Sequence, residues 1–276
     1  MKNTNAINFL LYSYFGFEIE DCKEKWDLDW NDFKEVEKSV LWKIIHKAYK
    51  DATQQGAYNA LVADNGREID LKYKGAIKIK NGISKLLDAK SVEEYDSEHN
   101  KICDYKDEGL IALYKDIKVK DKPTENAFTY GNAQKWINMT MKYLYVVNQI
   151  CEEYYDKKDY SNEEYKESFF VKIRKINDVE NQLHVPVDSY IIQAAWKEKT
   201  VKLPLKDERK GCREKDYKNL ADYVKAWSKW DNESKENALG DYSAFQTSLK
   251  ESIGNRIDWE CQKWIEVAKK RRGEEK

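Results

Sequence analysis

The sequence predicts a mostly α-helical protein. Turn-forming residues are scarce, with 11 Gly and 3 Pro in 276 residues, whereas 36% of the residues are charged. Few turn signals leave little room for the hairpins of a β protein and favour long helices. Apolar residues make up 41% of the chain and include 9 Trp, which is enough for a sizeable core. We therefore expect a globular chain, folded as one large domain or two modest ones.

Apolar spacing predicts most elements of the first half. The run Ile7 to Phe15 is too short to span a bilayer and predicts a buried first helix. Between Phe33 and Val62, apolar residues recur four positions apart, which is the spacing of one helix face. From Ile69 to Lys80, apolar and charged residues alternate around Gly75, so a short strand pair competes with helix there. Gly109 to Tyr114 predicts a short apolar helix.

The charged segment Asp116 to Asn126 contains a proline and is the best candidate for a boundary within the fold. It divides the chain into a helical half, residues 1–120, and a second helical half, residues 121–276, and the two can also form one integrated domain. An acidic, tyrosine-rich insertion is expected near 152–182. Further helices are predicted over 134–150, from 188 through 196, over 217–230 and over 241–271.

Charge and cysteine usage exclude several classes of protein. The formal net charge is −1, so any contact with nucleic acid must come from a local patch. The 5 cysteines are widely spaced and form no CxxC or Cys/His cluster, so we expect no metal and no other cofactor. No leader-like segment opens the chain and no apolar run approaches membrane length. These features predict a cytoplasmic protein with reduced thiols and no membrane partner.

Two short motifs carry the functional hypothesis. The first is Gly131-x-Ala133-x-Lys135-x-x-Asn138, in which a lysine follows two small residues at the predicted start of a helix. The second places Asp188 just after a proline, at the start of another helix. A carboxylate beside a lysine can take up the proton of the amine, and helix N-termini favour nearby phosphate. A lysine and an aspartate that meet in this way could perform nucleophilic chemistry.

The first motif is similar to the hairpin of the helix-hairpin-helix DNA glycosylases, in which Gly-x-Gly-x-Lys-x-x-Asn is common in members that carry the lysine. The second resembles the Val-Asp-Thr-His-Val segment of that family, and the two occur in the same order. The resemblance covers about a quarter of the chain, residues 128–196. Ala133 stands where the family has its second glycine, Ser189-Tyr190 replaces Thr-His, and the interval between the motifs is longer than usual.

The resemblance implies a helix-hairpin-helix glycosylase-like bundle of two helical halves that removes a base from DNA and then cleaves the strand as an AP lyase. It implies that Lys135 is the nucleophile, that Asp188 assists, and that the target nucleotide is flipped into a pocket between the halves. The hairpin residues implied to bind a DNA phosphate are Gly131, Asn132, Ala133 and Gln134.

Each key residue also has an ordinary structural interpretation. Lys135 can be a solvated lysine in the first turn of its helix, and Asp188 can simply be a helix N-cap, a role that Asp fills well. The corresponding alternatives for function are a non-catalytic helical protein, in nucleic-acid binding or host defence, or an α-helical protein-interaction module. A Lys135 amine within about 4 to 6 Å of the Asp188 carboxylate, at the mouth of a basic cleft, would favour the enzyme, whereas burial of either side chain in packing or a large separation would count against it.

Overall fold

The computed structural model describes residues 4–26, 30, 36–53, 67–104, 109–114, 118–119, 122–123, 128–198, 201–206, 224–232 and 240–274, with the backbone alone for 67–71, 118–119 and 122–123. This part of the chain is mostly helical, which confirms the predicted fold class. The one ladder of two strands among these residues is short: β1 (Lys118–Val119) pairs antiparallel with β2 (Lys122–Pro123).

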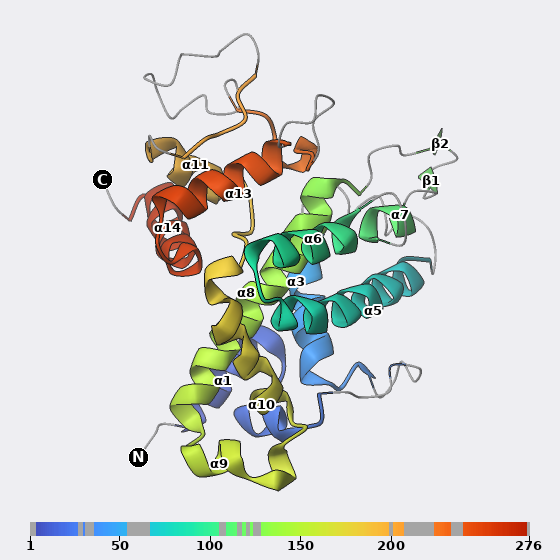
Figure 1. The fold of residues 1–276 in the computed structure, drawn as a ribbon, viewed down its shortest axis with the longest axis vertical. Helices are drawn as coiled ribbons and strands as arrows, with labels where there is room; N and C mark the ends of the chain where they lie inside the picture. The colour runs from blue at the N-terminus through green and yellow to red at the C-terminus, as the bar shows by residue number, and fades with distance from the viewer. Residues whose placement is uncertain are drawn as a thin grey trace.

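The long helix α8 (Tyr130–Tyr154) lies at the centre of the fold (Figure 1). It begins at Thr129, whose hydroxyl accepts a hydrogen bond from the backbone N–H of Asn132, a favourable N-cap. The helix α3 (Val40–Thr53) packs along it more extensively than any other described pair of helices. Neighbouring elements cover most of α8, so many of its polar residues are buried as well. Buried polar residues of α8 lie in and beside the candidate site.

The remaining elements surround α8 in three groups (Figure 1). At one end lie α1 (Thr4–Phe15), η1 (Ile19–Lys23), α9 (Lys157–Ser161), η2 (Glu163–Tyr165), α10 (Phe169–Ile173) and η3 (Arg174–Gln182). At the side lie α5 (Arg67–Asp88), α6 (Val92–Cys103) and α7 (Leu110–Tyr114). At the other end lie α11 (Ser189–Lys197), η6 (Trp227–Lys229), α13 (Asp241–Ser252) and α14 (Arg256–Arg271).

One hydrophobic core joins residues from both predicted halves, 1–120 and 121–276. It includes Val40 and Ile44 of α3 and Leu144 of α8, all fully buried. The indole N–H of Trp136 also crosses between the two helices and donates to the backbone oxygen of Ile45 at 3.0 Å. The division of the chain into two functional halves stays a prediction.

One expectation for the first half is corrected, and one open alternative is decided. The first helix is α1, as predicted, but it is not buried: Leu11 is buried, whereas Phe9, Leu10 and Tyr12 are exposed. The alternating stretch from Ile69 to Lys80 lies within α5 and is helical. Ala76, Ile79 and Ile83 of α5 point into the core at helical spacing, so packing decided in favour of helix.

Other differences follow from local caps. The polar stretch after Ser91 forms α6, because the Ser91 hydroxyl accepts from the backbone N–H of Glu94 and starts a helix that the composition alone did not predict. The helix expected over 241–271 is broken into α13 and α14, and Asn255 caps the second. The helix expected over 217–230 lies partly outside the described residues, and residues 224–230 contain only the short 3-10 turn η6.

Candidate functional site

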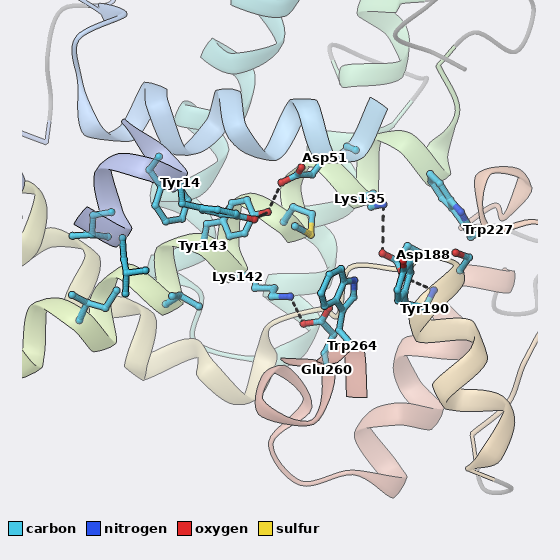
Figure 2. A pocket seen from close by; sticks show the side chains of 18 residues that line it. Tyr14, Asp51, Lys135, Lys142, Tyr143, Asp188, Tyr190, Trp227, Glu260 and Trp264 are labelled. Carbon is cyan, nitrogen blue, oxygen red and sulfur yellow. Dashed lines mark hydrogen bonds and ion pairs between the residues drawn. The ribbon is translucent and has the colours of Figure 1, made fainter. Parts of the chain in front are cut away.

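A pocket of about 730 Å³ lies against α8, between α1 and α3 on one side and α11, η6 and α14 on the other (Figure 2). Its lining residues are Leu10, Leu11, Tyr14, Phe15, Asp51, Ala52, Lys135, Met139, Lys142, Tyr143, Val146, Ile150, Asp188, Ser189, Tyr190, Trp227, Glu260 and Trp264. The two residues predicted to be catalytic, Lys135 and Asp188, are both among them.

The Lys135 ammonium lies 3.6 Å from Oδ2 of Asp188. Both side chains are largely sheltered, with 11% of Lys135 and 17% of Asp188 exposed. Asp188 is the N-cap of α11, and its Oδ1 accepts from the backbone N–H groups of Tyr190 and Ile191 at 2.8 and 3.0 Å. Its two oxygens therefore have separate partners, one in the cap and one across the pocket. The cap interpretation and the pairing with Lys135 are both correct.

The expected hairpin at Gly131 is wrong. Residues 131–134 lie in the first turns of α8 and are buried, and Lys135 lies in the second turn rather than at the helix start. A Cβ on Gly131 would lie 2.5 Å from the backbone oxygen of Trp227, so the glycine allows a close approach of η6 to α8. Gln134 and Ala133 are covered by neighbouring chain. As placed, these four residues offer no exposed turn to a phosphate.

A second ion pair lies deeper in the same pocket. The ammonium of Lys142, two turns beyond Lys135 on α8, is 2.5 Å from Oε2 of Glu260 on α14. Burial acts to lower the pKa of Lys142, but the charge of Glu260, its hydrogen bond and the other acidic groups nearby together outweigh burial, so the pKa of Lys142 is raised. Burial raises the pKa of Glu260 in spite of the lysine. The pocket thus holds an ammonium donor and a carboxylate acceptor side by side, shielded from water.

A chain of hydroxyl groups leads from α1 to the third carboxylate of the pocket. Tyr143 donates its O–H to Oδ2 of Asp51, and burial together with that carboxylate raises the pKa of Tyr143, so the phenol keeps its proton. Tyr14 is 2.8 Å from the Tyr143 oxygen and must be the donor there, since the Tyr143 hydrogen is already used. Asp51 also receives the ammonium of Lys47 at 3.0 Å. This carboxylate is fully engaged by its neighbours.

Aromatic side chains form one wall of the pocket. The rings of Tyr190 and Trp264 are stacked, with centroids 5.0 Å apart and planes 17° from parallel. The guanidinium of Arg271 lies 3.9 Å from the centre of the Tyr190 ring, and the Lys135 ammonium lies 5.0 Å from the centre of the Trp227 ring. Flat faces of this kind can hold a planar, unsaturated ring by stacking.

The charge of the lining does not match a basic cleft. Lys135 and Lys142 face three carboxylates, those of Asp188, Glu260 and Asp51. The expectation of a basic cleft is therefore not met by the lining itself. Positive charge lies beside it instead, in the last turn of α14, where Arg271 contacts Ser189 and Tyr190.

The spacing of residues in the sequence indicates some of the pocket residues that lie outside the two motifs. Lys135, Met139 and Lys142 are spaced by four and three positions, so they share one face of a helix. Glu260 and Trp264 are likewise one turn apart. Nothing in the local sequence joins these two faces, because the contact between α8 and α14 is a long-range one. Among the described residues, no group of three or more His, Cys, Asp or Glu side chains converges on a metal-binding position.

No known family, curated protein or solved structure matches the chain in the comparisons. Function is therefore argued from the pocket. None of the described helices combines the length and the apolar character needed to cross a bilayer.

Proposed function

We propose that the protein is a base-excision enzyme of the DNA glycosylase and AP lyase type, with Lys135 as nucleophile and Asp188 as the assisting carboxylate. The observation that carries the proposal is the 3.6 Å contact between their side chains inside the pocket of about 730 Å³. The lysine and the aspartate were selected from the sequence independently of their distance, and 53 positions of chain separate them, from 135 to 188.

The chemistry requires a neutral amine beside a group that can accept its proton. Lys135 would attack C1′ of the target nucleotide as the bond from C1′ to the base nitrogen breaks, and the departing base would take up a proton. Asp188 would first take a proton from the Lys135 ammonium and pass it to the departing base. As the anion again, it would offset the positive charge that develops on the sugar and then accept the second proton of the bound amine. Opening of the sugar ring gives a Schiff base with Lys135, and elimination of the 3′ phosphate then cleaves the strand.

The rest of the pocket fits a flipped base. The stacked pair Tyr190 and Trp264 offers an aromatic wall for a base to lie against. The ion pair of Lys142 and Glu260 offers a hydrogen-bond donor and acceptor for the edge of the base. A volume of about 730 Å³ is ample for a nucleobase with its sugar. In this proposal the phosphates are held by the basic last turn of α14 beside the pocket rather than by residues 131–134.

The test is a borohydride trapping assay on duplexes that contain an abasic site or a panel of lesions. Wild-type protein is expected to form a covalent adduct, and peptide mapping of the adduct should place the modification on Lys135. Lys135→Gln should abolish the adduct. Lys142 is the matched control because it lies in the same pocket, so mapping of the adduct to Lys142 or failure to trap any adduct would overturn the proposal.

One observation favours a second candidate, an α-helical protein-interaction module. The α1 face beside the pocket exposes large apolar side chains: Phe9 is 70% exposed, Leu10 66% and Tyr12 64%. Exposed apolar patches of this kind often mark interaction surfaces. If no adduct forms on any DNA and the α1 variant Phe9→Ser abolishes binding to a purified protein partner, the interaction module replaces the enzyme.

A further inference from the structure

A buried hydrogen-bond network lies next to the Lys135–Asp188 pair, and it is centred three residues along α8 from Lys135. Its centre is Asn138, fully buried one turn after Lys135. The Asn138 amide nitrogen lies 2.7 Å from the Tyr242 oxygen, 3.0 Å from Oε1 of Gln134 and 3.4 Å from the backbone oxygen of Val185. Its two hydrogens serve the two nearer oxygens, and the longer contact to Val185 shares one of them. The network thus ties α8 to α13 and to the segment that leads into Asp188.

The hydrogen positions in this network follow from its backbone partners. The backbone oxygen of Gly131 can only accept, so the Gln134 amide turns its nitrogen there, at 2.9 Å, and its oxygen towards Asn138. The backbone oxygen of Val185 likewise requires the nitrogen of Asn138. The Asn138 oxygen is then left facing Nε2 of His99 at 2.8 Å, so His99 carries its hydrogen on Nε2.

The same reasoning assigns the donors and acceptors in the part of the network that runs from Tyr242 through His184 to Asp96. Tyr242 already accepts from Asn138, so its own O–H points to Nδ1 of His184 at 2.8 Å. Nδ1 of His184 is therefore bare, and Nε2 donates to Oδ1 of Asp96 at 2.7 Å. Every donor from His99 to Asp96 has an acceptor, and both imidazoles are neutral. Burial lowers the pKa of His99 to about 3 and that of His184 below its usual value, which agrees with this order.

Val185 is held from a second direction. The side-chain amide of Gln246 on α13 accepts from the backbone N–H of Val185 at 3.0 Å and donates to its oxygen at 2.8 Å. All of these groups are buried. Val185 lies three residues before Asp188, and Asn138 lies three residues after Lys135, so the junction fixes the two chain segments that carry the pair.

We infer that Asn138, Tyr242 and Gln246 are positioning residues: they pin Val185 against α8 and thereby set the distance between the Lys135 amine and the Asp188 carboxylate. Their importance for catalysis rests on the proposed function, but the positioning itself does not. None of the three lines the pocket that holds Lys135 and Asp188, so each acts on that pair from outside the pocket. Tyr242 and Gln246 line a separate pocket of about 510 Å³, together with His99 and His184.

The test uses the full chain with Tyr242→Phe, which removes only the hydroxyl, and Gln246→Met, which keeps the volume of the side chain. Tyr160→Phe is the control, because Tyr160 is a half-buried tyrosine whose hydroxyl is shielded from water but which lies in α9, outside this network. Circular dichroism and thermal melting establish that each variant is folded. The first readout is the rate of trace acetylation of the Lys135 amine, measured by mass spectrometry against Lys142.

Asp188→Asn is the reference variant for the size of the change in Lys135 labelling, because it removes the carboxylate that holds and shields the Lys135 amine. Tyr242→Phe and Gln246→Met are expected to raise the labelling of Lys135 in the same direction, whereas Tyr160→Phe should match wild type. If Asp188→Asn raises labelling and neither network variant does, the inference is overturned. It is also overturned if Asp188→Asn leaves labelling unchanged, because there is then no pair to position.

The second readout is the rate of adduct formation on abasic duplex. Both network variants should lower the maximal rate about tenfold or more with DNA affinity unchanged, since small displacements of reacting groups have effects of this size. Loss of affinity at an unchanged maximal rate would contradict positioning. If wild-type protein forms no adduct, the proposed function fails alone, and the labelling result still decides whether these residues position the pair.

Discussion

The two oxygens of Asp188 point in different directions: Oδ1 caps α11, and Oδ2 lies 3.6 Å from the Lys135 ammonium. The helix cap fixes the rotation of the carboxylate and so presents the free oxygen to the pocket. A structural role and a chemical role are therefore combined in one side chain, and substitutions can separate them.

Asp188→Asn and Asp188→Ala should both abolish base release, because neither side chain can accept a proton or offset positive charge. Asn retains the cap and Ala does not, so the alanine variant should be about 1 kcal/mol less stable than the asparagine variant. Urea unfolding of the two proteins measures this difference. Equal stabilities would show that the cap contributes nothing, and base release by Asp188→Asn would exclude the carboxylate from the chemistry.

Glu260→Gln should destabilise the protein by about 3 kcal/mol, because it leaves the Lys142 ammonium buried without its carboxylate. The double variant with Lys142→Met should recover much of that loss, since a buried apolar pair avoids the cost of desolvating a charge. Glu266→Gln, in an exposed ion pair on the same helix, is the control and should change stability by less than about 0.5 kcal/mol. A Glu260→Gln protein as stable as that control would contradict a structural role for the pair.

His99 should remain neutral throughout the range in which the protein is folded. Its pKa is lowered to about 3 by burial, so its folded pKa lies below the unfolded value of about 6.5. Its contribution to stability is complete above about pH 6.5 and is lost as the pH falls towards 3, by about 2 kcal/mol at pH 5. The chain has only 3 histidines, so NMR titration can follow each one. Titration of the His99 imidazole near pH 6 would refute this prediction.

Gly131→Ala should destabilise the protein by about 1–3 kcal/mol, because the added methyl group would overlap the backbone of Trp227 and Ser228. Trp227 lines the pocket, so the same change should also shift its fluorescence. Gly254→Ala is the control, since a Cβ there meets nothing within 4 Å. The close packing of η6 on α8 would be disproved if the two variants proved equally stable by urea unfolding.

Much of the fold could be predicted from the sequence, because the residue spacing and the caps that determine a helix lie within a short stretch of chain. The i, i+4 spacing of Val40, Ile44 and Ala48 predicts a buried helix face, and all three are fully buried in α3. Val36, four positions earlier, is buried too but lies before the turn that precedes α3. Helix N-caps could also be predicted from residue type, as Asp188 at the start of α11 shows. Local patterns left the outcome open, or predicted the wrong one, where contacts with segments far away in sequence decided it. The alternating stretch of α5 became helix because α3 and α6 pack against it, and the apolar α1 stayed exposed although its composition suggested burial.

The candidate site divides in the same way. The sequence by itself determined that Lys135 follows the start of a helix and that Asp188 begins another, since residue type and spacing are sufficient for both. Only the tertiary structure decided that these helices meet, that Gly131 serves close packing rather than a turn, and that Lys142 pairs with Glu260. The physical reason is that an ion pair or a buried hydrogen bond depends on where two distant segments come together, which no local pattern of residues encodes.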